Sequence, residues 1–258
     1  MPQVAKKLYG WRPDIPDQRD YTYKALTKVA KLPAKVDLRP GLPGVYDQGQ
    51  LGSCVANAVA GAIAFNLKRQ KAREFMPSRL FIYYNARALI NATAYDSGAY
   101  IRDGIKTVNK QGTTSEIVWP YSDAIPGPFT TRPPNQAYSE ALNHQVTTYM
   151  RVTQTTNALR QCLADGFPFV FGFSVYESFE SDVVAQTGIV PMPKRTERML
   201  GGHAVVAVGY DDAKQMFLVR NSWGSEWGLG GYFWMPYAYL TNANLASDFW
   251  TLRAIEQG

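Results

Sequence analysis

The pattern of apolar and polar positions divides the chain into two parts of different texture. The first part contains three segments of helical character, at residues 54–70, 78–90 and 99–110. Small and apolar residues fill the first segment, and Ser53 before it is suited to an N-cap. Gly112 stands just past the third segment, where a helix commonly ends.

After residue 153 the texture becomes strand-like. Residues 155–166 predict a short helix closed by Gly166. Four apolar runs separated by turn residues then predict strands, at 167–175, 202–211, 215–223 and 230–240. The stretch 113–153 between the two parts holds five prolines and no sustained period, so we expect an irregular connection there. The sequence therefore predicts an α+β chain of two lobes, helical and then strand-rich, with a cleft where they meet.

The composition indicates which class of protein this is. The 258 residues are 46% apolar and 19% charged, which is ordinary for a globular protein. No apolar run approaches the roughly 20 residues that a membrane span needs. The N-terminal residues show no apolar signal-peptide region, so we expect a cytoplasmic protein or one exported by a route not visible here.

The positive charge is concentrated at the N-terminus. Of the formal net charge of +6, residues 1–35 carry +5, because eight basic residues there face three acidic ones. The basic residues are Lys6, Lys7, Arg12, Arg19, Lys24, Lys28, Lys31 and Lys35. The body of the chain is then close to neutral, which disfavours a nucleic-acid-binding function and indicates a basic N-terminal arm.

Cysteine and histidine are scarce. The chain has Cys54, Cys162, His144 and His203, and no Cys-x-x-Cys or His-x-x-x-His spacing. We therefore expect no zinc site and no metal. Two cysteines allow at most one disulfide and favour free thiols in a reducing compartment.

Cys54 stands where a glycine-containing loop becomes a helix. A thiol at a helix N-terminus faces free backbone N–H groups and the positive end of the helix dipole, which favour the nucleophilic thiolate. A lone cysteine is more often a small core residue. Gly49 and Gly52 argue for the nucleophile, because they let the backbone turn tightly and approach a ligand.

A thiolate nucleophile needs an imidazole partner and a group that orients the imidazole. His203 follows two glycines at the start of an apolar strand, and Asn221 lies eighteen residues later. The Asn221 amide can accept the second imidazole N–H, and Trp223 can cover that bond from water. His144 lies in a polar stretch and is more typical of a surface or turn histidine.

Together these residues resemble the papain-like cysteine peptidases, of the cathepsin-like group found in bacteria. The family's nucleophile signature resembles residues 51–55, and its Gln-Gly pair resembles Gln48-Gly49. His203 follows Cys54 by 149 residues, and Asn221 stands in an Asn-Ser-Trp-Gly sequence at 221–224. Residues 32–40 resemble the family's mature N-terminus, so the likeness covers about residues 32–258.

The resemblance implies a fold and a division of the chain. The fold is the papain-like two-lobed α+β fold, with a helical N-terminal lobe, an antiparallel β-barrel-like C-terminal lobe and the active-site cleft between them. The division is a basic, short propeptide-like arm at 1–31 and a peptidase domain at 32–258. The helical lobe covers roughly 48–125 and the β lobe roughly 145–258.

The resemblance also implies roles for the site residues. Cys54 is the nucleophile, His203 shares its proton, and Asn221 orients His203. The side-chain amide of Gln48 and the backbone N–H of Cys54 form the oxyanion hole. The expected activity is endopeptidase hydrolysis of peptide or protein substrates through a thioester, without a cofactor.

The resemblance places substrate-binding positions as well. They are Gly98, Ala99, Gly172, Gly201, Gly202 and Trp223. Three pocket-wall positions are then Ala or Gly, so we expect a wide pocket that prefers Phe, Tyr or Leu over Val or Ala.

Departures from the family concern the nucleophile's neighbours and the arm. Leu51 stands where the family usually has a disulfide-forming Cys, and Val55 stands where it has an aromatic residue. An arm of about 31 residues is too short for an independent helical prodomain. Its aromatic and proline residues suit a strap across the groove, and the alternative is a disordered arm.

Three other functions remain open from the sequence alone. They are a Cys-His acyltransferase of transglutaminase type, an inactive relative that serves as a binding module, and a protein that binds nucleic acid or a partner through its basic arm. An acyltransferase of that type usually has Asp as the third residue, whereas this chain has Asn221.

Overall fold

The computed structural model of the chain describes residues 9–23 and 31–256. Four of the basic arm residues, Lys6, Lys7, Lys24 and Lys28, lie outside the described residues. The helices of the described part are α1 (Cys54–Arg69), α2 (Arg79–Ala88), α3 (Ile101–Lys110), α4 (Asn135–Ala141), α5 (Thr156–Ala164), α6 (Asp182–Thr187) and α7 (Tyr237–Thr241). Its strands are β1 (Trp11–Arg12), β2 (Lys35–Asp37), β3 (Ala99–Tyr100), β4 (Val146–Arg151), β5 (Phe169–Tyr176), β6 (Met199–Asp211), β7 (Met216–Arg220), β8 (Tyr232–Pro236) and β9 (Ala246–Ile255). Short 3₁₀ turns occur at Arg39–Gly41, Pro128–Thr130 and Glu177–Glu180.

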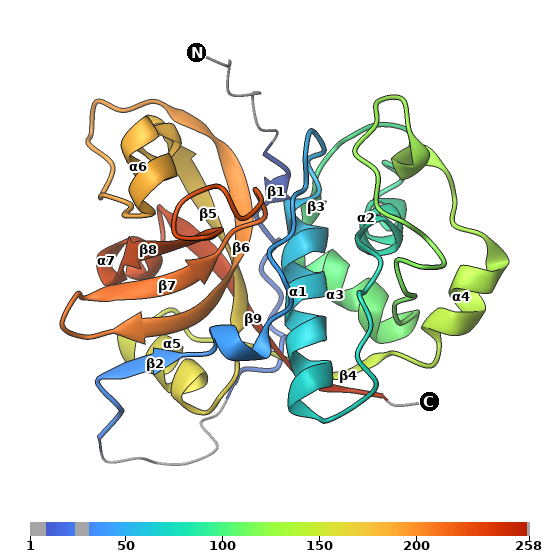
Figure 1. Cartoon of the computed structure of the whole chain (residues 1–258), viewed down its shortest axis with the longest axis horizontal. Helices are drawn as coiled ribbons and strands as arrows, with labels where there is room; N and C mark the ends of the chain where they lie inside the picture. The colour runs from blue at the N-terminus through green and yellow to red at the C-terminus, as the bar shows by residue number, and fades with distance from the viewer. Residues whose placement is uncertain (1–8, 24–30, 257–258) are drawn as a thin grey trace.

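Helix α1 stands between the other helices of the first part and the sheet of the second (Figure 1). Every residue from Cys54 to Leu67 is buried, which requires a helix that is small and apolar on all sides. Gly104 of α3 lies opposite Val55 and Val59, so the two helices approach closely there. The small residues of α1 therefore let both lobes pack against one helix.

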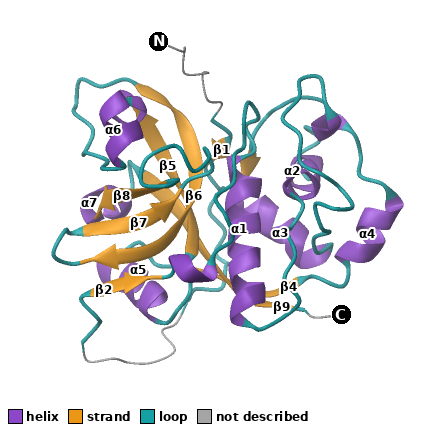
Figure 2. Cartoon of the chain, viewed as in Figure 1, coloured by secondary structure: helices purple, strands orange, loops and turns teal. Residues whose placement is uncertain are grey.

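The second part is built on an antiparallel sheet (Figure 2). Its strand order is β4-β9-β5-β6-β7-β8, and β2 pairs with β6 in addition. The two faces of β5 serve two cores: Val170 packs in the cluster that includes α1, whereas Phe169 and Phe171 pack in a second cluster within the lobe. The stacked rings of Phe171 and Phe249, 5.5 Å apart, lie in that second cluster.

The strand-rich second part and the helical first part agree with the expected α+β, two-lobed architecture. The sequence pattern predicted segments that overlap these elements: helices α1, α2, α3 and α5, and strands β5, β6, β7 and β8. Among the described residues, no helix combines the length and the apolar character needed to cross a bilayer.

Several local predictions were wrong. The stretch 113–153 is not wholly irregular, because it contains α4 after Pro134 and β4 at its end. The run 230–240 ends in helix α7, since Pro236 stops β8 and its φ suits the entry to a helix. Ser53 is the N-cap residue of α1, as expected, but its side chain makes no capping bond; its hydroxyl bonds Tyr121 instead, at 2.7 Å.

Candidate active site

Cys54 is the first residue of α1, and its thiol is completely buried. The loop before it turns at Gly49, whose φ of +56° lies in the left-handed region that favours glycine. Backbone N–H groups of Ala204, Gly10 and Val55 approach the sulfur. Ala204 directly follows His203 on β6. The Cys54 thiol therefore lies against the backbone next to His203, at the junction of the two lobes.

The expectation that the helix N-terminus favours the thiolate form of Cys54 is wrong for this structure. Burial raises the pKa of Cys54 to about 11, and the N–H groups around the sulfur offset this only in part. Burial disfavours the charged form of the sulfur and so favours the neutral thiol. The backbone N–H of Gly10, a residue of the N-terminal arm, is one of the groups that lower this pKa.

His203 and Asn221 are brought together by the pairing of β6 with β7. Asn221 follows the last residue of β7, and His203 lies buried in β6. His203 Nε2 and Asn221 Oδ1 are 2.8 Å apart, and since an amide oxygen only accepts, Nε2 is the donor. This bond fixes the tautomer and leaves Nδ1 as the ring nitrogen for proton exchange.

Aromatic rings hold the imidazole of His203 in place. The ring of Trp223 stacks on it at 5.0 Å, and the ring of Phe173 meets it edge-on at 5.7 Å. Trp223 is only 7% exposed. The indole thus lies where it shields the bond between His203 and Asn221 from water.

Gln48 connects the loop before Cys54 to the loop that carries Asn221. Its side-chain oxygen accepts from the hydroxyl of Ser222 at 2.7 Å, and its Nε2 donates to the carbonyl of Leu51 at 2.9 Å. The Gln48 backbone N–H also donates to the Ser222 carbonyl at 2.9 Å. The expected oxyanion donor is therefore oriented from both lobes.

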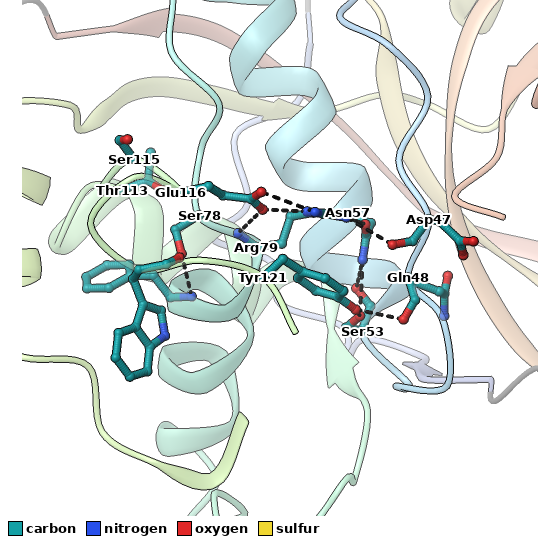
Figure 3. Close-up of polar contacts among 12 residues, drawn as sticks. Asp47, Gln48, Ser53, Asn57, Ser78, Arg79, Thr113, Ser115, Glu116 and Tyr121 are labelled. Carbon is teal, nitrogen blue, oxygen red and sulfur yellow. Dashed lines mark hydrogen bonds and ion pairs between the residues drawn. The ribbon is translucent and has the colours of Figure 1, made fainter. Parts of the chain in front are cut away.

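A polar network supports this loop from the side of α2 (Figure 3). Tyr121 donates to the carbonyl of Gln48 and bonds the hydroxyl of Ser53. Behind it, Arg79 forms an ion pair with Glu116 at 2.6 Å and reaches the carbonyl of Asp47. The network was not foreseen, because its members are far apart in the sequence and carry no motif.

The predicted pocket positions surround a side chain of the arm. An added Cβ would lie 1.9 Å from Trp11 at Gly172 and 2.6 Å from it at Gly202. Ala99, another predicted wall, pairs with Trp11 in the two-stranded ladder of β1 and β3. The glycines therefore open a slot between the lobes, and the indole of Trp11, only 8% exposed, occupies it.

The arm continues on both sides of this slot. The Ala99 N–H donates to the Gly10 carbonyl at 2.7 Å, at the backbone edge where Gly98 has a φ of +70°. A Cβ at Gly10 would lie 1.7 Å from the carbonyl oxygen of Gly52, so only glycine passes this point. Tyr9 lies over the rings of His203 and Trp223 and close to Gly201. Strand β1 lies beside β3 at the beginning of α1 (Figure 1).

Buried charges anchor the next part of the arm. The backbone N–H of Asp14 donates to Asp248 at 2.8 Å, and the Asp14 carboxylate accepts from Trp250 and from the Arg102 backbone. Burial, together with the nearby Asp248, raises the pKa of Asp14 to about 6. Asp20 completes the contact by pairing with Arg102.

The other cysteine and histidine lie elsewhere. Cys162 is fully buried on α5, where burial raises the pKa of its thiol to about 12. His144 packs against the ring of Phe75 at 4.5 Å, in a cavity that also includes Glu140. In the described residues, no group of three or more His, Cys, Asp or Glu side chains is arranged to hold a metal ion.

Comparisons with known proteins give this geometry a context. A family model described as papain family cysteine protease matches residues 32–250. The chain is 45% identical to an uncharacterised peptidase C1-like protein of Acanthamoeba polyphaga mimivirus, over 96% of this chain and 87% of that protein. It is 31% identical to a cathepsin B-like protein of Giardia intestinalis, over 74% of this chain and 64% of that protein. The crystal structure of xylellain, a cysteine protease from Xylella fastidiosa, superposes with a TM-score of 0.91 at 48% identity, over 95% of this chain and 96% of that chain.

Proposed function

The chain belongs to the papain family of cysteine proteases, and from that premise we propose that Cys54, His203 and Asn221 are its catalytic residues. One observation carries the proposal. The imidazole of His203 is bound through Nε2 to Asn221 at 2.8 Å. The backbone N–H of Ala204, the residue after His203, approaches the Cys54 sulfur. A nucleophile, a base and a group that orients the base thus meet at one point of the cleft.

Each side chain then has a defined step in peptide hydrolysis. His203 Nδ1 first takes the proton of the Cys54 thiol, and the resulting thiolate attacks the peptide carbonyl carbon. Nδ1 then gives that proton to the departing amine. A thioester forms as the carbon–nitrogen bond breaks. His203 next takes a proton from water, the resulting hydroxide displaces the sulfur, and the acid product leaves with the thiol restored.

The oxyanion of each tetrahedral intermediate is stabilised by the Gln48 amide and the Cys54 backbone N–H. The position of Gln48, bound to Leu51 and Ser222, supports this role. A donor of this kind contributes roughly 3 kcal/mol to the transition state.

The same geometry supports autoinhibition by residues 9–23. Gly10 takes the backbone edge of Ala99, and Trp11 takes the slot beside Gly172, so a peptide substrate cannot occupy either. Gly10 presents its backbone N–H to the Cys54 sulfur, so the arm lies directly against the proposed nucleophile.

The pocket residues and the division of the chain form part of the proposal. Gly98 binds the substrate backbone, and Ala99, Gly172 and Gly201 line its side-chain pocket. Gly202 is a further substrate-binding position, and Trp223 covers the imidazole. Residues 1–31 act as the regulatory arm of a peptidase domain at 32–258. The amide at Asn221 and the protease relatives disfavour transglutaminase-type acyl transfer.

The test compares point variants on a generic fluorogenic peptide and an epoxide inhibitor of papain-like enzymes. The parent protein should hydrolyse the peptide slowly, through the fraction of molecules whose arm has opened, and should be labelled on Cys54 at a correspondingly low rate. Cys54→Ala and His203→Ala should abolish turnover. The matched controls Cys162→Ala and His144→Ala should keep it, since neither residue lies at the site. Loss of turnover in His144→Ala but not in His203→Ala would contradict the assignment.

A further inference from the structure

The hydroxyl of Tyr121 holds the backbone of Gln48 on the side away from the sheet. It donates to the Gln48 carbonyl at 2.8 Å. On the other side, the Gln48 N–H donates to the carbonyl of Ser222 at 2.9 Å. The main chain of the residue that carries the proposed oxyanion donor is therefore held by one hydrogen bond from each lobe.

The residue after Gln48 leaves the connecting peptide free to turn. Gly49 has a φ of +56°, and a glycine can also adopt the opposite sign without steric cost. The N–H of this peptide donates to the carboxylate of Asp47 at 2.9 Å, but Asp47 is exposed and water competes for it. The bond from Tyr121 to the carbonyl of the same peptide is partly buried. Without that bond the peptide can rotate and carry the Gln48 side chain out of place.

The hydrogen bonds behind Tyr121 all run in one direction (Figure 3). A guanidinium only donates, so Arg79 donates to Oδ1 of Asn57 at 3.2 Å. The Asn57 amide then donates to Oγ of Ser53 at 3.1 Å. The single hydroxyl proton of Tyr121 is used on the Gln48 carbonyl, so Ser53 donates to Tyr121 at 2.7 Å. Bonds aligned in this way polarise one another, and the chain of donors ends at Gln48.

Arg79 also acts directly on the ring of Tyr121. Its guanidinium carbon lies 3.9 Å from the ring centre, and Glu116 holds it there through the ion pair at 2.6 Å. Burial raises the pKa of Tyr121 to about 12, although the positive charge of Arg79 opposes this rise. The hydroxyl therefore keeps its proton at neutral pH and remains a donor to Gln48.

The same network reaches the second proposed oxyanion donor. The side-chain amide of Asn57 donates to the carbonyl of Ser53 at 3.0 Å, and so does the Asn57 backbone N–H, also at 3.0 Å. This carbonyl belongs to the peptide whose N–H is that of Cys54. The helical lobe thus fixes both peptides on which the oxyanion hole depends.

We propose that Tyr121 is a positioning residue for peptide hydrolysis, whose hydroxyl holds the Gln48 backbone so that the Gln48 amide points at the oxyanion. Tyr121 makes no contact with the reacting atoms in this role and acts only through Gln48. The inference rests on the proposed function, in which Gln48 stabilises the oxyanion. It adds a residue outside the cleft to the groups that set the rate.

The test uses Tyr121→Phe in the full-length protein, because this change keeps the ring over Arg79 and removes only the hydroxyl. Two rates are measured: kcat/KM for a fluorogenic peptide amide, and the rate constant for alkylation of Cys54 by iodoacetamide. Amide hydrolysis passes through an oxyanion, whereas alkylation displaces iodide and forms none. Opening of the arm scales both rates by the same factor, so their ratio reports the oxyanion hole. The ratio of hydrolysis to alkylation should fall by about tenfold, less than the roughly 10²- to 10³-fold loss when such a donor is removed outright.

A matched control and a double variant separate positioning from a general structural effect. Tyr138→Phe also removes a partly buried hydroxyl, one that donates to Asn85 at 2.9 Å away from the site, and its ratio should match that of the parent. Gln48→Ala should itself lower the ratio. Adding Tyr121→Phe to Gln48→Ala should then lower it by about twofold at most, because the side chain that Tyr121 positions is already gone. If Tyr121→Phe does not fold, Ser53→Ala takes its place, since it removes the donor to Tyr121 and should also lower the ratio.

Three results would overturn the inference while leaving the protease proposal intact. They are an unchanged ratio in Tyr121→Phe or in its substitute Ser53→Ala, an equal fall in Tyr138→Phe, and the full tenfold effect of Tyr121→Phe in the Gln48→Ala background. Absence of peptide hydrolysis in both the parent and Tyr138→Phe would instead refute the proposed function, and the inference with it.

Discussion

Replacing Trp11 by alanine should open the arm and expose Cys54. A buried tryptophan removes about 150–250 Å² from water, which at about 25 cal/mol per Å² is worth roughly 4–6 kcal/mol. This is an upper value, because a released arm buries part of that surface again. Trp11 is 8% exposed, so nearly all of its side chain contributes. We take roughly 3 kcal/mol as the loss, which corresponds to about a hundredfold shift toward the open arm.

The assay is alkylation of the two thiols by iodoacetamide, followed by peptide mapping. The Cys54 rate should rise by about a hundredfold in Trp11→Ala, up to the rate of a fully open site. Cys162 is an internal control, because it is buried in the β lobe and reacts only if that lobe unfolds. Tyr21→Ala is the matched variant, since Tyr21 is an arm aromatic that is 79% exposed.

Three results would count against this reasoning. Equal Cys54 rates in the parent and in Trp11→Ala would mean that the indole does not hold the arm closed. An equal acceleration in Tyr21→Ala would mean that any change in the arm has the same effect, whatever its burial. A rise in Cys162 labelling that matches the rise at Cys54 would show unfolding of the lobe and would count against a local opening.

Three further predictions concern the hydrogen bond to the base, the arm's carboxylate and the buried ion pair. Asn221→Ala should lower kcat by about 10- to 100-fold with little change in KM, because it removes the bond that orients His203; a loss below threefold would contradict that role. The pKa of Asp14 is raised to about 6, so the closed arm holds a proton that the released arm gives up. Closure of the arm should be strongest below about pH 4, weaken as the pH rises through about 6 and stay constant above that. The Cys54 alkylation rate of the parent, divided by that of Trp11→Ala, should therefore increase between pH 4 and 7. A constant ratio would show that Asp14 is not coupled to closure. Glu116→Ala should lower the free energy of unfolding by about 3–5 kcal/mol in urea, since it leaves the buried Arg79 without its carboxylate, and a loss below about 1 kcal/mol would show that water replaces it.

The candidate site could be predicted from the sequence because its reactive residues are of types that are rare in this chain. With two cysteines and two histidines, the choice of nucleophile and base was small, and the position of Cys54 before a run of small apolar residues predicted the start of α1. The His203 strand and the Asn221 turn could be recognised locally, and the structure brings their side chains within 2.8 Å.

The contacts of the arm could not be predicted in this detail. Trp11 meets Gly172 and Asp248, which lie more than 150 residues away, and no local pattern encodes such pairings. Strand β9 was missed for a related reason: its alternation is broken at Asp248, where the left-handed backbone and the shift in register interrupt the period. Helix α4 was missed because it is only seven residues long. Its two buried residues, Ala137 and Ala141, are too few to give a periodic pattern.

The second attachment of the arm sets the concentration dependence of the proposed autoinhibition. Tyr21 and Tyr23 exchange backbone hydrogen bonds with Arg151 at 2.7 Å, so the chain is fastened to the sheet edge a short distance after Trp11. In the proposed autoinhibition the arm acts as a tethered ligand, and a short tether corresponds to an effective concentration in the millimolar range. Dilution does not release such a ligand, and even a weak intrinsic affinity keeps the site covered. The same tether makes closure a unimolecular and reversible event, so one molecule can open, act and close again without losing its inhibitor.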